Sequence, residues 1–330
     1  MAATIYEVAA LAGVSPATVS RVLNGGRVSE GYAQRVREAV DTLQFRPNRT
    51  ARNLRRQRSE IIALIIPDIE NPFFTALARG VEDQALRAGY SVVLCNTDEH
   101  PEKEARYLEM ALSGHLAGVV LAPASAATRL DALVESRLPV VTVDRPAHGP
   151  EVDAVVMDDV AAARRATTAL YDQGYGRVGC ITGPRDVDTA TARATGWREV
   201  FLDRSASADP AEYVRFADYR VAGGRAAMLE LLHLPTPPDA VFVANNLMSL
   251  GALQQLVEAD LRPPAVGLAS LGELPFLPPG TPGVTVEPWP ARELGTAAAA
   301  LLLERIDGAE GPARTVVIRA AGDEPVQPQA

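Results

Sequence analysis

The chain has 330 residues, 47% of them hydrophobic, and a net charge of −9. At roughly 100–200 residues per domain, this length predicts about two or three domains with enough apolar material for a buried core. No apolar run approaches the ~18 residues that span a bilayer, which excludes a transmembrane helix. The first residues also lack the basic-then-apolar pattern of a secretory leader, so we expect a cytoplasmic protein with no membrane partner.

Residues that usually carry chemistry are sparse. Cys95 and Cys180 each lie in an apolar run, and two lone cysteines form neither a disulfide framework nor a zinc site, so we expect two small buried side chains. The four histidines lack metal-ligand spacing, and the phosphate-loop, H-E-x-x-H and G-x-S-x-G motifs are absent. We therefore expect no catalytic residues, no metal and no cofactor.

Charge is distributed unevenly along the chain. Residues 1–58 contain ten arginines and four acidic residues, which gives this segment a charge of +6. The rest of the chain has 22 basic and 37 acidic residues, or −15. A basic head on an acidic body suggests that only the head meets a polyanion.

The first residues in chain order predict three short helices. Ile5, Val8, Ala9 and Ala12 form one apolar stripe, and Gly13 ends that helix. Ser15 then has the features of an N-cap and Pro16 those of a first-turn proline, while Val19, Val22 and Leu23 form the inner face of the second helix. A third helix follows, with Ser29 as a candidate cap and a stripe made of Ala33, Val36, Val40 and Leu43.

Three helices with a tight turn between the first two describe a helix-turn-helix unit. The second helix of such a unit enters the DNA major groove with its N-terminal end first. Ala17, Thr18 and Ser20 are short enough to approach base edges, and Arg21 can donate two hydrogen bonds to guanine. The alternative is a helical hairpin without a DNA role, which the charge of the head disfavours.

The next stretch, "FRPNRTARNLRRQRS" at residues 45–59, combines a helix signal with basic charge. Pro47 ends the third helix, and Asn48 can cap a short helix that runs to about Arg55. Leu54 is surrounded by arginines, which fits a side chain that wedges between base steps in the minor groove. The alternative is a flexible basic linker, and both descriptions hold before DNA binds if the segment folds on binding.

From Glu60 onward, strand-like runs alternate with helical stretches. Apolar β-branched runs between helices predict buried parallel sheets, and two such series predict two sheets with a cleft between them. Strands are expected at residues 61–67, 91–97, 118–123, 139–144, 154–158, 177–183, 213–217, 240–245, 265–270, 283–288 and 315–320. Helices are expected at 72–88, 101–113, 126–136, 159–173, 190–204, 220–232, 247–259 and 291–306.

Polar residues cluster where these strands end, and ligands of such folds bind beyond the carboxyl ends of the strands. A small polar ligand in the cleft is therefore expected. The clusters are residues 68–71, residues 96–98, Asp144-Arg145, Asp158-Asp159 and Asn245-Asn246.

Taken in order, the motifs resemble those of the lac repressor family of bacterial transcription regulators, over nearly the whole chain. They are "TIYEVAALAGVSPATVSRVLNG", "RPNRTARNLR", "IPDIENPFF", "RGVEDQALRAGYSVVLCNTD", "GVVLAP", "PVVTVDRP", "ITGP", "TARATGWR" and "VANNLMSLGAL". The resemblance implies a sequence-specific repressor that binds a pseudo-palindromic operator as a homodimer and is controlled by a small-molecule effector. The C-terminus has no leucine heptads, so a dimer is expected rather than a tetramer.

The resemblance also implies the domain plan of an α/β protein. Residues 1–46 would form the three-helix helix-turn-helix domain and residues 47–59 the hinge helix or linker. Residues 60–330 would form an effector-binding and dimerisation core like a periplasmic binding protein, with parallel sheets in two subdomains. The N-subdomain would span about 60–160 plus 290–320, and the C-subdomain about 161–287.

Site residues follow by position. The implied DNA contacts are Ile5, Tyr6, Ser15, Pro16, Ala17, Thr18, Ser20, Arg21, Asn24, Ser29, Asn48, Ala51 and Leu54, with Leu54 at a central CpG step. The implied effector contacts are Phe73, Phe74, Asp144, Arg193, Asp218 and Asn245. Arg193 and Asp144 would hold hydroxyls or a carboxylate, and the two phenylalanines would cover an apolar face.

The chain departs from the family pattern around the cleft. Ala269 replaces a carboxylate that commonly binds sugar hydroxyls, Asn246 replaces an aspartate, and Asp218 stands where an aromatic ring often stacks on the ligand. The segment "VEPWPARELG" replaces the usual Arg-Gln-Pro crossover and adds Trp289 near the cleft. These changes leave the effector open between a carbohydrate, meaning a sugar or sugar derivative, and other metabolites.

Three alternatives stay open. A solute-binding protein would suit the core, but the basic head and the missing leader argue against it. A metabolic enzyme on the same fold would need a catalytic constellation, and none is found. A regulator that requires a corepressor differs from an inducible repressor only in the sign of the coupling, which the sequence does not reveal.

Overall fold

The computed structural model describes residues 3–23, 26–45, 59–204 and 208–319. The chain forms two units, residues 1–59 and residues 60–330, which are considered separately below. No helix in the described ranges is both long and apolar enough to cross a membrane.

The first unit, which we call the head, consists of α1 (Ile5–Ala12), α2 (Pro16–Leu23) and α3 (Glu30–Thr42). Thr4 and Glu7 form a capping box at the start of α1, and Gly13, with φ +61°, ends that helix as predicted. The predicted apolar stripes meet in one small core. That core contains Val8, Ala9, Ala12, Val19, Val36 and Ala39, flanked by Ile5, Val14, Val22, Leu23, Val40, Leu43 and Phe45.

The two predicted serine caps of the head differ. The Ser15 hydroxyl accepts a hydrogen bond from the Thr18 backbone N–H (3.2 Å), which is the predicted cap of α2. Ser29 occupies the N-cap position of α3, as predicted, but its side chain makes no capping hydrogen bond. Residues 29–32 are exposed, and water can therefore satisfy the first N–H groups of α3.

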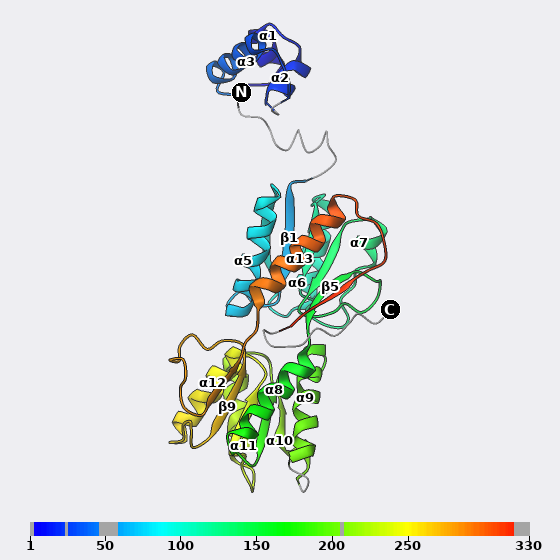
Figure 1. Ribbon diagram of the computed structural model, residues 1–330. Coiled ribbons are helices and arrows are strands. Elements are labelled where there is room, and N and C mark those ends of the chain that lie inside the picture. The colour runs from blue at the N-terminus through cyan, green and yellow to red at the C-terminus, as the bar shows by residue number, and fades with distance from the viewer. Residues whose placement is uncertain (1–2, 24–25, 46–58, 205–207, 320–330) are drawn as a thin grey trace. The chain divides into compact units, whose positions relative to one another are not determined.

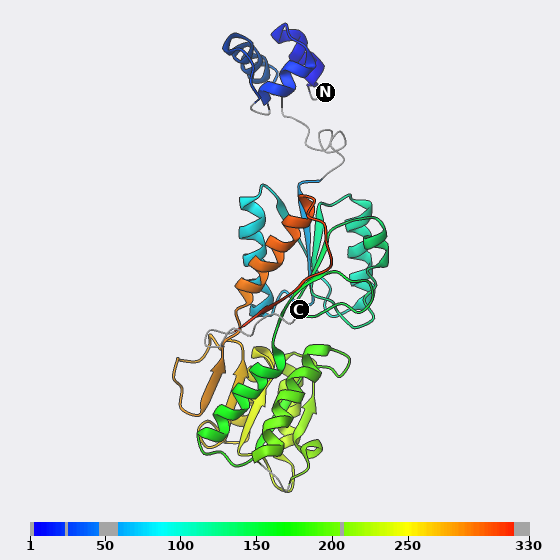
Figure 2. The same cartoon turned by 45° about the vertical axis from the view of Figure 1, so that its right-hand side comes forward.

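The second unit, which we call the core, contains two fully parallel sheets (Figures 1 and 2). The six-stranded sheet has the order β11-β5-β4-β3-β1-β2 and defines the N-lobe. Its strands are β1 (Ile61–Ile66), β2 (Ser91–Asn96), β3 (Gly118–Leu121), β4 (Val140–Val143), β5 (Asp153–Met157) and β11 (Thr315–Ile318). The N-lobe helices are α5 (Pro72–Arg87), α6 (Pro101–Ser113), α7 (Asp131–Glu135) and α13 (Ala291–Ile306).

The five-stranded sheet has the order β10-β9-β8-β6-β7 and defines the C-lobe. Its strands are β6 (Val178–Thr182), β7 (Val214–Phe216), β8 (Ala240–Val243), β9 (Gly267–Leu271) and β10 (Val284–Glu287). The C-lobe helices are α8 (Asp159–Asp172), α9 (Asp188–Arg204), α10 (Pro210–Tyr213), α11 (Val221–Leu232) and α12 (Asn246–Glu258). Both sheets confirm the predicted α/β class with buried parallel strands.

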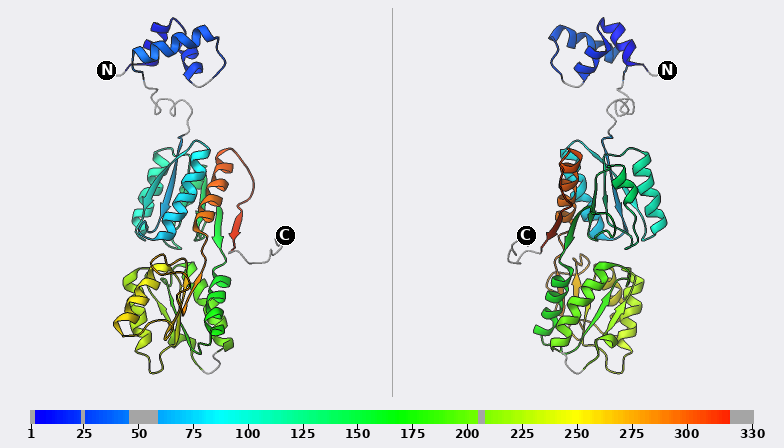
Figure 3. Two further views of the ribbon diagram at one scale, coloured as in Figure 1. Left: turned by 60° about the vertical axis from the view of Figure 1, so that its left-hand side comes forward. Right: turned by 90° about the vertical axis from the view of Figure 1, so that its right-hand side faces the viewer.

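The chain crosses between the lobes twice within the described residues. The first crossover, residues 157–159, joins β5 to α8, and the second, residues 287–291, joins β10 to α13 (Figure 3). Helix α13 therefore returns to the N-lobe, where it packs closely on α5. A Cβ atom at Gly80 would lie only 2.1 Å from the Arg292 carbonyl oxygen, so this close approach requires glycine.

Two predicted elements needed correction. The helix expected across 126–136 is shorter, because the Thr128 hydroxyl bonds to Glu104 and to the Ser125 carbonyl in a turn, and α7 begins only at Asp131. The short helix α10 was not predicted, and it takes Tyr213 from the expected strand. Asp209 caps it and Pro210 begins it, which is a recognisable start signal in the sequence.

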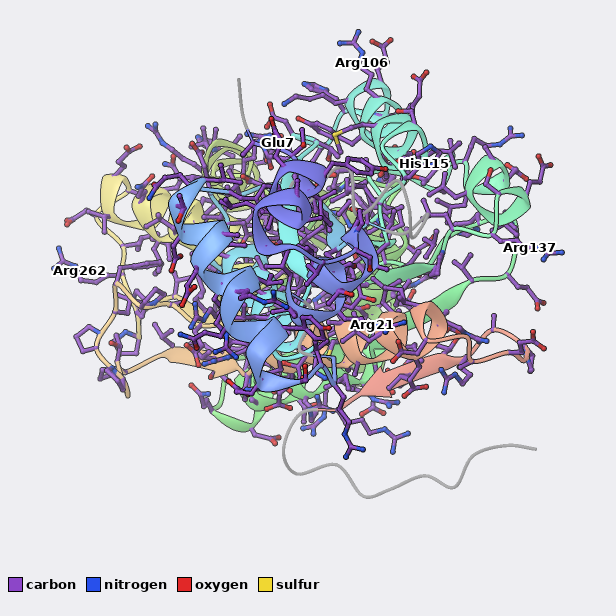
Figure 4. All side chains as sticks on the ribbon, turned by 90° about the horizontal axis from the view of Figure 1, so that it is seen from above. Glu7, Arg21, Arg106, His115, Arg137 and Arg262 are labelled. Carbon is purple, nitrogen blue, oxygen red and sulfur yellow. The ribbon has the colours of Figure 1, made fainter. Side chains whose placement is uncertain are left out.

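Both cysteines are buried and unpaired, as expected, in the two lobes. Arg106, Arg137 and Arg262 extend outward from the ribbon of the core (Figure 4).

Candidate functional site

The head exposes the residues that the sequence assigns to DNA. Ser15, Ala17 and Arg21 are exposed, Pro16, Thr18 and Ser20 are partly exposed, and Val19 between them is fully buried. The buried Val19 fixes how α2 packs, so the polar residues beside it lie on the outer side of the helix. Arg21, one of these residues, is labelled in Figure 4. A helix face of short side chains with one arginine suits base contacts in a major groove.

The other predicted DNA contacts fall into two groups. Tyr6 is 67% exposed and Ser29 is exposed, whereas Ile5 also packs against the core of the head. Asn24, Asn48, Ala51 and Leu54 lie outside the described residues.

All six predicted effector residues line one pocket between the two lobes of the core. The pocket encloses about 590 Å³ of empty space, part of it open to solvent. Its lining residues are Asp68, Asn71, Phe73, Phe74, Glu99, Asp144, Arg145, Thr189, Arg193, Asp218, Tyr219, Arg220, Ala244, Asn245, Asn246, Leu271, Gly272 and Trp289. Segments that are far apart in the sequence therefore build one wall, at the carboxyl ends of parallel strands.

Asp144 and Arg193 face each other across this pocket. Asp144 follows β4 of the N-lobe with φ +67°, a left-handed conformation that aspartate tolerates better than most residues. Arg193 comes from α9 of the C-lobe, and its Nη2 lies 4.0 Å from Asp144 Oδ1. Burial raises the pKa of the Asp144 carboxyl, and the neighbouring Arg193 and Arg145 oppose that rise.

Arg145 is held from the N-lobe side. Its Nη1 and Nη2 donate to the two carboxylate oxygens of Glu99 (2.8 Å each), and Nη1 also donates to the Pro123 carbonyl (3.0 Å). Its Nε is buried without a hydrogen-bond partner and lies 3.7 Å from Asp144 Oδ2. This N–H is therefore free to meet a ligand.

Aromatic rings supply the apolar part of the wall. Phe73 and Phe74 meet edge to face at 4.9 Å between ring centroids. Tyr219 donates to or accepts from Thr189 (3.0 Å), and its ring lies 5.7 Å from the Arg145 guanidinium and 5.8 Å from that of Arg193.

Two predicted residues line the pocket and also bond to the backbone of nearby loops. The Asn245 side chain accepts from the Met248 N–H (2.8 Å), which caps α12, and donates to the Tyr219 carbonyl (2.9 Å). Asp218 Oδ1 accepts from the Arg220 N–H (2.9 Å), and its neighbour Tyr219 brings an aromatic ring to the pocket. Both side chains therefore shape the loops that carry other lining residues.

Ala269, the residue that replaces a family carboxylate, lies away from the pocket. It is fully buried within β9 and does not line the pocket, where Leu271 and Gly272 follow it. No carboxylate therefore enters the pocket from the end of this strand.

Two ion pairs join the lobes at exposed positions. Arg220 donates to Asp98 (2.7 Å), which lowers the pKa of that carboxyl, and His148 lies 2.5 Å from Asp188. Across the described residues, no group of acidic, cysteine or histidine side chains could hold a metal ion.

Several lining residues, including Asp68, Glu99, Arg145, Tyr219 and Trp289, were not among the six predicted effector contacts, although Trp289 was expected near the cleft. Most of them immediately follow a predicted strand. The clusters at strand ends had marked Asp68 and Arg145 as polar positions, but their roles depend on partners elsewhere in the chain.

A helix-turn-helix head and a parallel two-lobed core with a polar pocket define a class of protein: a ligand-responsive DNA-binding regulator. Residues 4–48 match the model of bacterial regulatory proteins of the lacI family. Residues 59–321 match the model of periplasmic binding proteins and the sugar binding domain of the LacI family. The chain belongs to the LacI family, and its function is the regulation of transcription.

Relatives agree with this assignment. The HTH-type transcriptional repressor CytR of Escherichia coli (strain K12) is 33% identical over 315 residues, which cover 93% of this chain and 91% of that protein. The ribose operon repressor of the same strain is 33% identical over 311 residues, covering 92% and 93%. Both are named as repressors, and neither is named as an enzyme.

Solved structures show the same fold. The transcriptional regulator CelR–cellobiose complex aligns with a TM-score of 0.72 and 30% identity, covering 96% of this chain and 97% of that one. The lac repressor dimer bound to operator aligns with a TM-score of 0.84 and 23% identity over 97% of both chains, which supports the fold.

Proposed function

We propose that this protein is a cytoplasmic repressor that binds a pseudo-palindromic operator as a homodimer and responds to a neutral, polyhydroxylated effector in the pocket between its lobes. The observation that carries the effector class is the unsatisfied Asp144 carboxylate. Among the described residues, none donates a hydrogen bond to it, while Arg193 Nη2 and Arg145 Nε lie 4.0 and 3.7 Å away.

A hydroxyl group fits this arrangement because it both donates and accepts. It would donate to Asp144 and accept from either arginine. A phosphate or carboxylate only accepts and would leave the Asp144 oxygens without a donor, whereas an ammonium group only donates and would face the arginines. Neutral sugars and sugar derivatives present such hydroxyls together with an apolar ring face, which Phe73 and Trp289 would cover.

The relatives support a carbohydrate, since two of them are a ribose operon repressor and a regulator in complex with cellobiose. The end of β9 contributes Leu271 and Gly272 to the pocket and no carboxylate, so the hydroxyl contact that family members commonly make there is missing. We therefore place a sugar derivative with an apolar substituent beside the simple sugars as a candidate.

A homodimer is supported by the edge of the N-lobe sheet. β2 is an edge strand and exposes Val93 and Leu94, and α5, which packs against β2, exposes Leu86. Exposed apolar side chains on an edge strand favour pairing with another chain, and a two-fold dimer matches a palindromic operator. In this proposal, Asn48, Ala51 and Leu54 belong to a hinge helix that binds the minor groove.

The first test is selection of binding sites from random duplex DNA with the full-length protein at one stated salt concentration. We expect a palindrome with a central CpG step, and we expect Leu54→Ala to weaken binding to that palindrome more than binding to random DNA. Equal loss on both DNAs would remove the wedge role. If only salt-sensitive, non-specific binding emerges, the protein does not bind an operator specifically without its effector, and that part of the proposal fails. The selection is then repeated with D-ribose and with cellobiose as corepressors.

The second test measures release of the selected operator by D-ribose, by cellobiose and by their phosphorylated counterparts. We expect a neutral sugar to change operator affinity and a phosphorylated one to have no effect. A response to phosphorylated sugars alone would overturn the neutral class. The direction of the change decides between induction and corepression.

A further inference from the structure

Arg193 contacts both crossovers between the lobes. Its Nε donates to Asp159 Oδ1 at the first crossover (2.6 Å), and its guanidinium lies 4.9 Å from the Trp289 ring centroid at the second. We infer that Arg193 transmits effector occupancy to the two crossovers, and that Asp159 and Trp289 are the positioning residues that make this transmission possible. This inference rests on the proposed function, because it assumes that an effector binds in the pocket.

The contact with the first crossover is short and buried. The side chains of Arg193 and Asp159 are only 7% and 9% exposed. The start of α8 is fixed independently, because the neighbouring Asp158 accepts a hydrogen bond from the Ala161 N–H (2.9 Å) and caps the helix. Asp159 is thus held in place by backbone structure, and a shift of the guanidinium must strain this ion pair or move the crossover.

The contact with the second crossover involves an indole that belongs to neither lobe alone. Trp289 packs against the hydrophobic core of the C-lobe and against that of the N-lobe. Pro288 and Pro290 flank it, which fixes their own φ angles and restricts the residue that precedes each of them. Because the backbone on either side of Trp289 is restricted, we expect its ring to shift when the angle between the two lobes changes.

Arg193, Asp159 and Trp289, with their contacts at the two crossovers, form what we call the bracket. The other two nitrogens of Arg193 connect this bracket to the pocket. Nη1 donates to the Ala244 carbonyl at the end of β8 (2.9 Å), and Nη2 faces Asp144 of the N-lobe at 4.0 Å. A hydroxyl that accepts from Nη2 and donates to Asp144 would link a C-lobe arginine to an N-lobe carboxylate. Since the guanidinium is planar and rigid, any displacement at Nη2 is felt at Nε and at the stacked face.

Other contacts between the lobes are poorly suited to this role. The Arg220–Asp98 pair is 44% and 42% exposed, and His148–Asp188 is 53% and 41% exposed. Exposed ion pairs are screened by water and salt and contribute little. Arg193 touches both crossovers while it also lines the pocket, and Asp159 touches Arg193 without lining the pocket.

The first experiment tests the bracket without any effector. In full-length protein carrying Trp197→Phe, Trp289 is the only tryptophan, and its emission and quenching by acrylamide report its surroundings. We expect Arg193→Lys and Asp159→Ala each to raise the acrylamide quenching constant at least twofold, and Asp159→Asn, which keeps an acceptor oxygen, to restore most of the original value. Unchanged Trp289 quenching in Asp159→Ala would overturn the positioning role of Asp159, whatever the effector is.

The second experiment measures the coupling itself, as the ratio of effector Kd values with and without the selected operator. The probe is D-ribose or cellobiose, whichever changes operator affinity of the wild-type protein. We expect Asp159→Ala to reduce this ratio at least fivefold while the effector Kd of the free protein changes less than threefold. Trp289→Leu should reduce the ratio as well, with a larger change in Kd because this residue lines the pocket.

The control is His148→Asn, which removes an exposed contact between the lobes and touches neither Arg193 nor the pocket. We expect it to keep the wild-type ratio. Loss of effector affinity in Asp159→Ala with an unchanged ratio would overturn the inference. If neither sugar acts on the wild-type protein, the carbohydrate proposal fails, while the quenching experiment still decides whether the bracket exists.

Discussion

The head and the pocket recognise their partners with arginines in opposite environments. Arg21 lies exposed on α2, whereas Arg193 and Arg145 are almost fully buried in the pocket. The exposed arginine keeps its water until DNA replaces it, so its contribution depends on salt and on the partner. The buried arginines have lost that water already, and Asp159 and Glu99 compensate for the loss.

Because of this difference, substitutions in the head and in the pocket should affect ligand binding and stability differently. A substitution on the outer side of α2 removes a contact with DNA and leaves the fold of the head unaltered. A substitution in the pocket also leaves a buried charge without its counter-ion. The predictions below test this difference.

Arg193→Ala has the largest expected effect. We expect the effector response to be lost, with at least a hundredfold weaker effector binding and operator affinity preserved. We also expect the free energy of unfolding to fall by about 3–5 kcal/mol, because Asp144 and Asp159 would remain buried without this counter-charge. Calorimetric titration and urea unfolding measure the two effects.

The control for Arg193→Ala is Arg106→Ala, an exposed arginine on α6. We expect it to change stability by less than about 0.5 kcal/mol and to leave the effector response intact. A normal effector response of Arg193→Ala would remove Arg193 from the pocket, and equal destabilisation by both variants would contradict the contrast between buried and exposed arginines.

The pH dependence of Asp159→Asn has the next largest expected effect. Burial raises the pKa of Asp159 from 3.8 to about 6, despite the opposing charge of Arg193. The stability that this group contributes is therefore fully present below pH 3.8 and is lost as the pH rises through about 6. Asparagine has no such proton, so the stability of the variant minus that of the wild type should rise by up to about 3 kcal/mol between pH 4 and 7.

Urea unfolding of both proteins at pH 4, 5, 6 and 7 measures this difference. Taking the difference between variant and wild type cancels the other carboxylates, which titrate in the same range. A difference that does not change with pH would mean that the pKa of Asp159 is not raised in the folded protein.

The sequence predicted the head and the pocket to different depths, for a physical reason. The residues of α2 lie within one contiguous motif, so helical periodicity alone separates buried Val19 from exposed Arg21. The pocket depends on tertiary partners. Arg193 was predicted to line it, but nothing in the sequence near Arg193 shows that its Nε meets Asp159, 34 positions earlier in the chain.

The three-dimensional surroundings that the sequence does not show also explain two local differences between prediction and structure. The serine at the start of α3 satisfies the rule for caps, yet a cap also needs a particular side-chain orientation, which Ser29 does not adopt. The strands and helices of the core were predictable because continuous apolar runs mark buried parallel strands and the stretches between them fit helices. The start of the helix expected at residue 126 was not, because it depended on a long-range hydrogen bond from Thr128 to Glu104.

Arg21→Ala has a moderate expected effect, confined to DNA. We expect a loss of about 1–3 kcal/mol, or roughly 5–150-fold, in affinity for the selected operator, because a bidentate contact with guanine would disappear. The control Arg37→Ala removes the same charge from α3, where Arg37 is exposed and pairs with Glu30 (3.4 Å). Equal losses for the two variants, measured at the same salt concentration, would show that charge rather than base contact explains Arg21.

The smallest effect separates the two N-caps of the head. The Thr4 side chain accepts from the Glu7 N–H (3.3 Å), and the Glu7 carboxylate accepts from the Thr4 N–H (2.7 Å), whereas Ser29 makes no such bond. We expect Thr4→Ala to lower the opening free energy of α1 by about 1 kcal/mol, and Ser29→Ala to change that of α3 by no more than a few tenths. Hydrogen–deuterium exchange of the helix amides in the full-length protein measures both values. Ser29 is also a predicted DNA contact, so Ser29→Ala should weaken operator binding without destabilising the head, and the opposite pattern would show that it acts as a cap in solution.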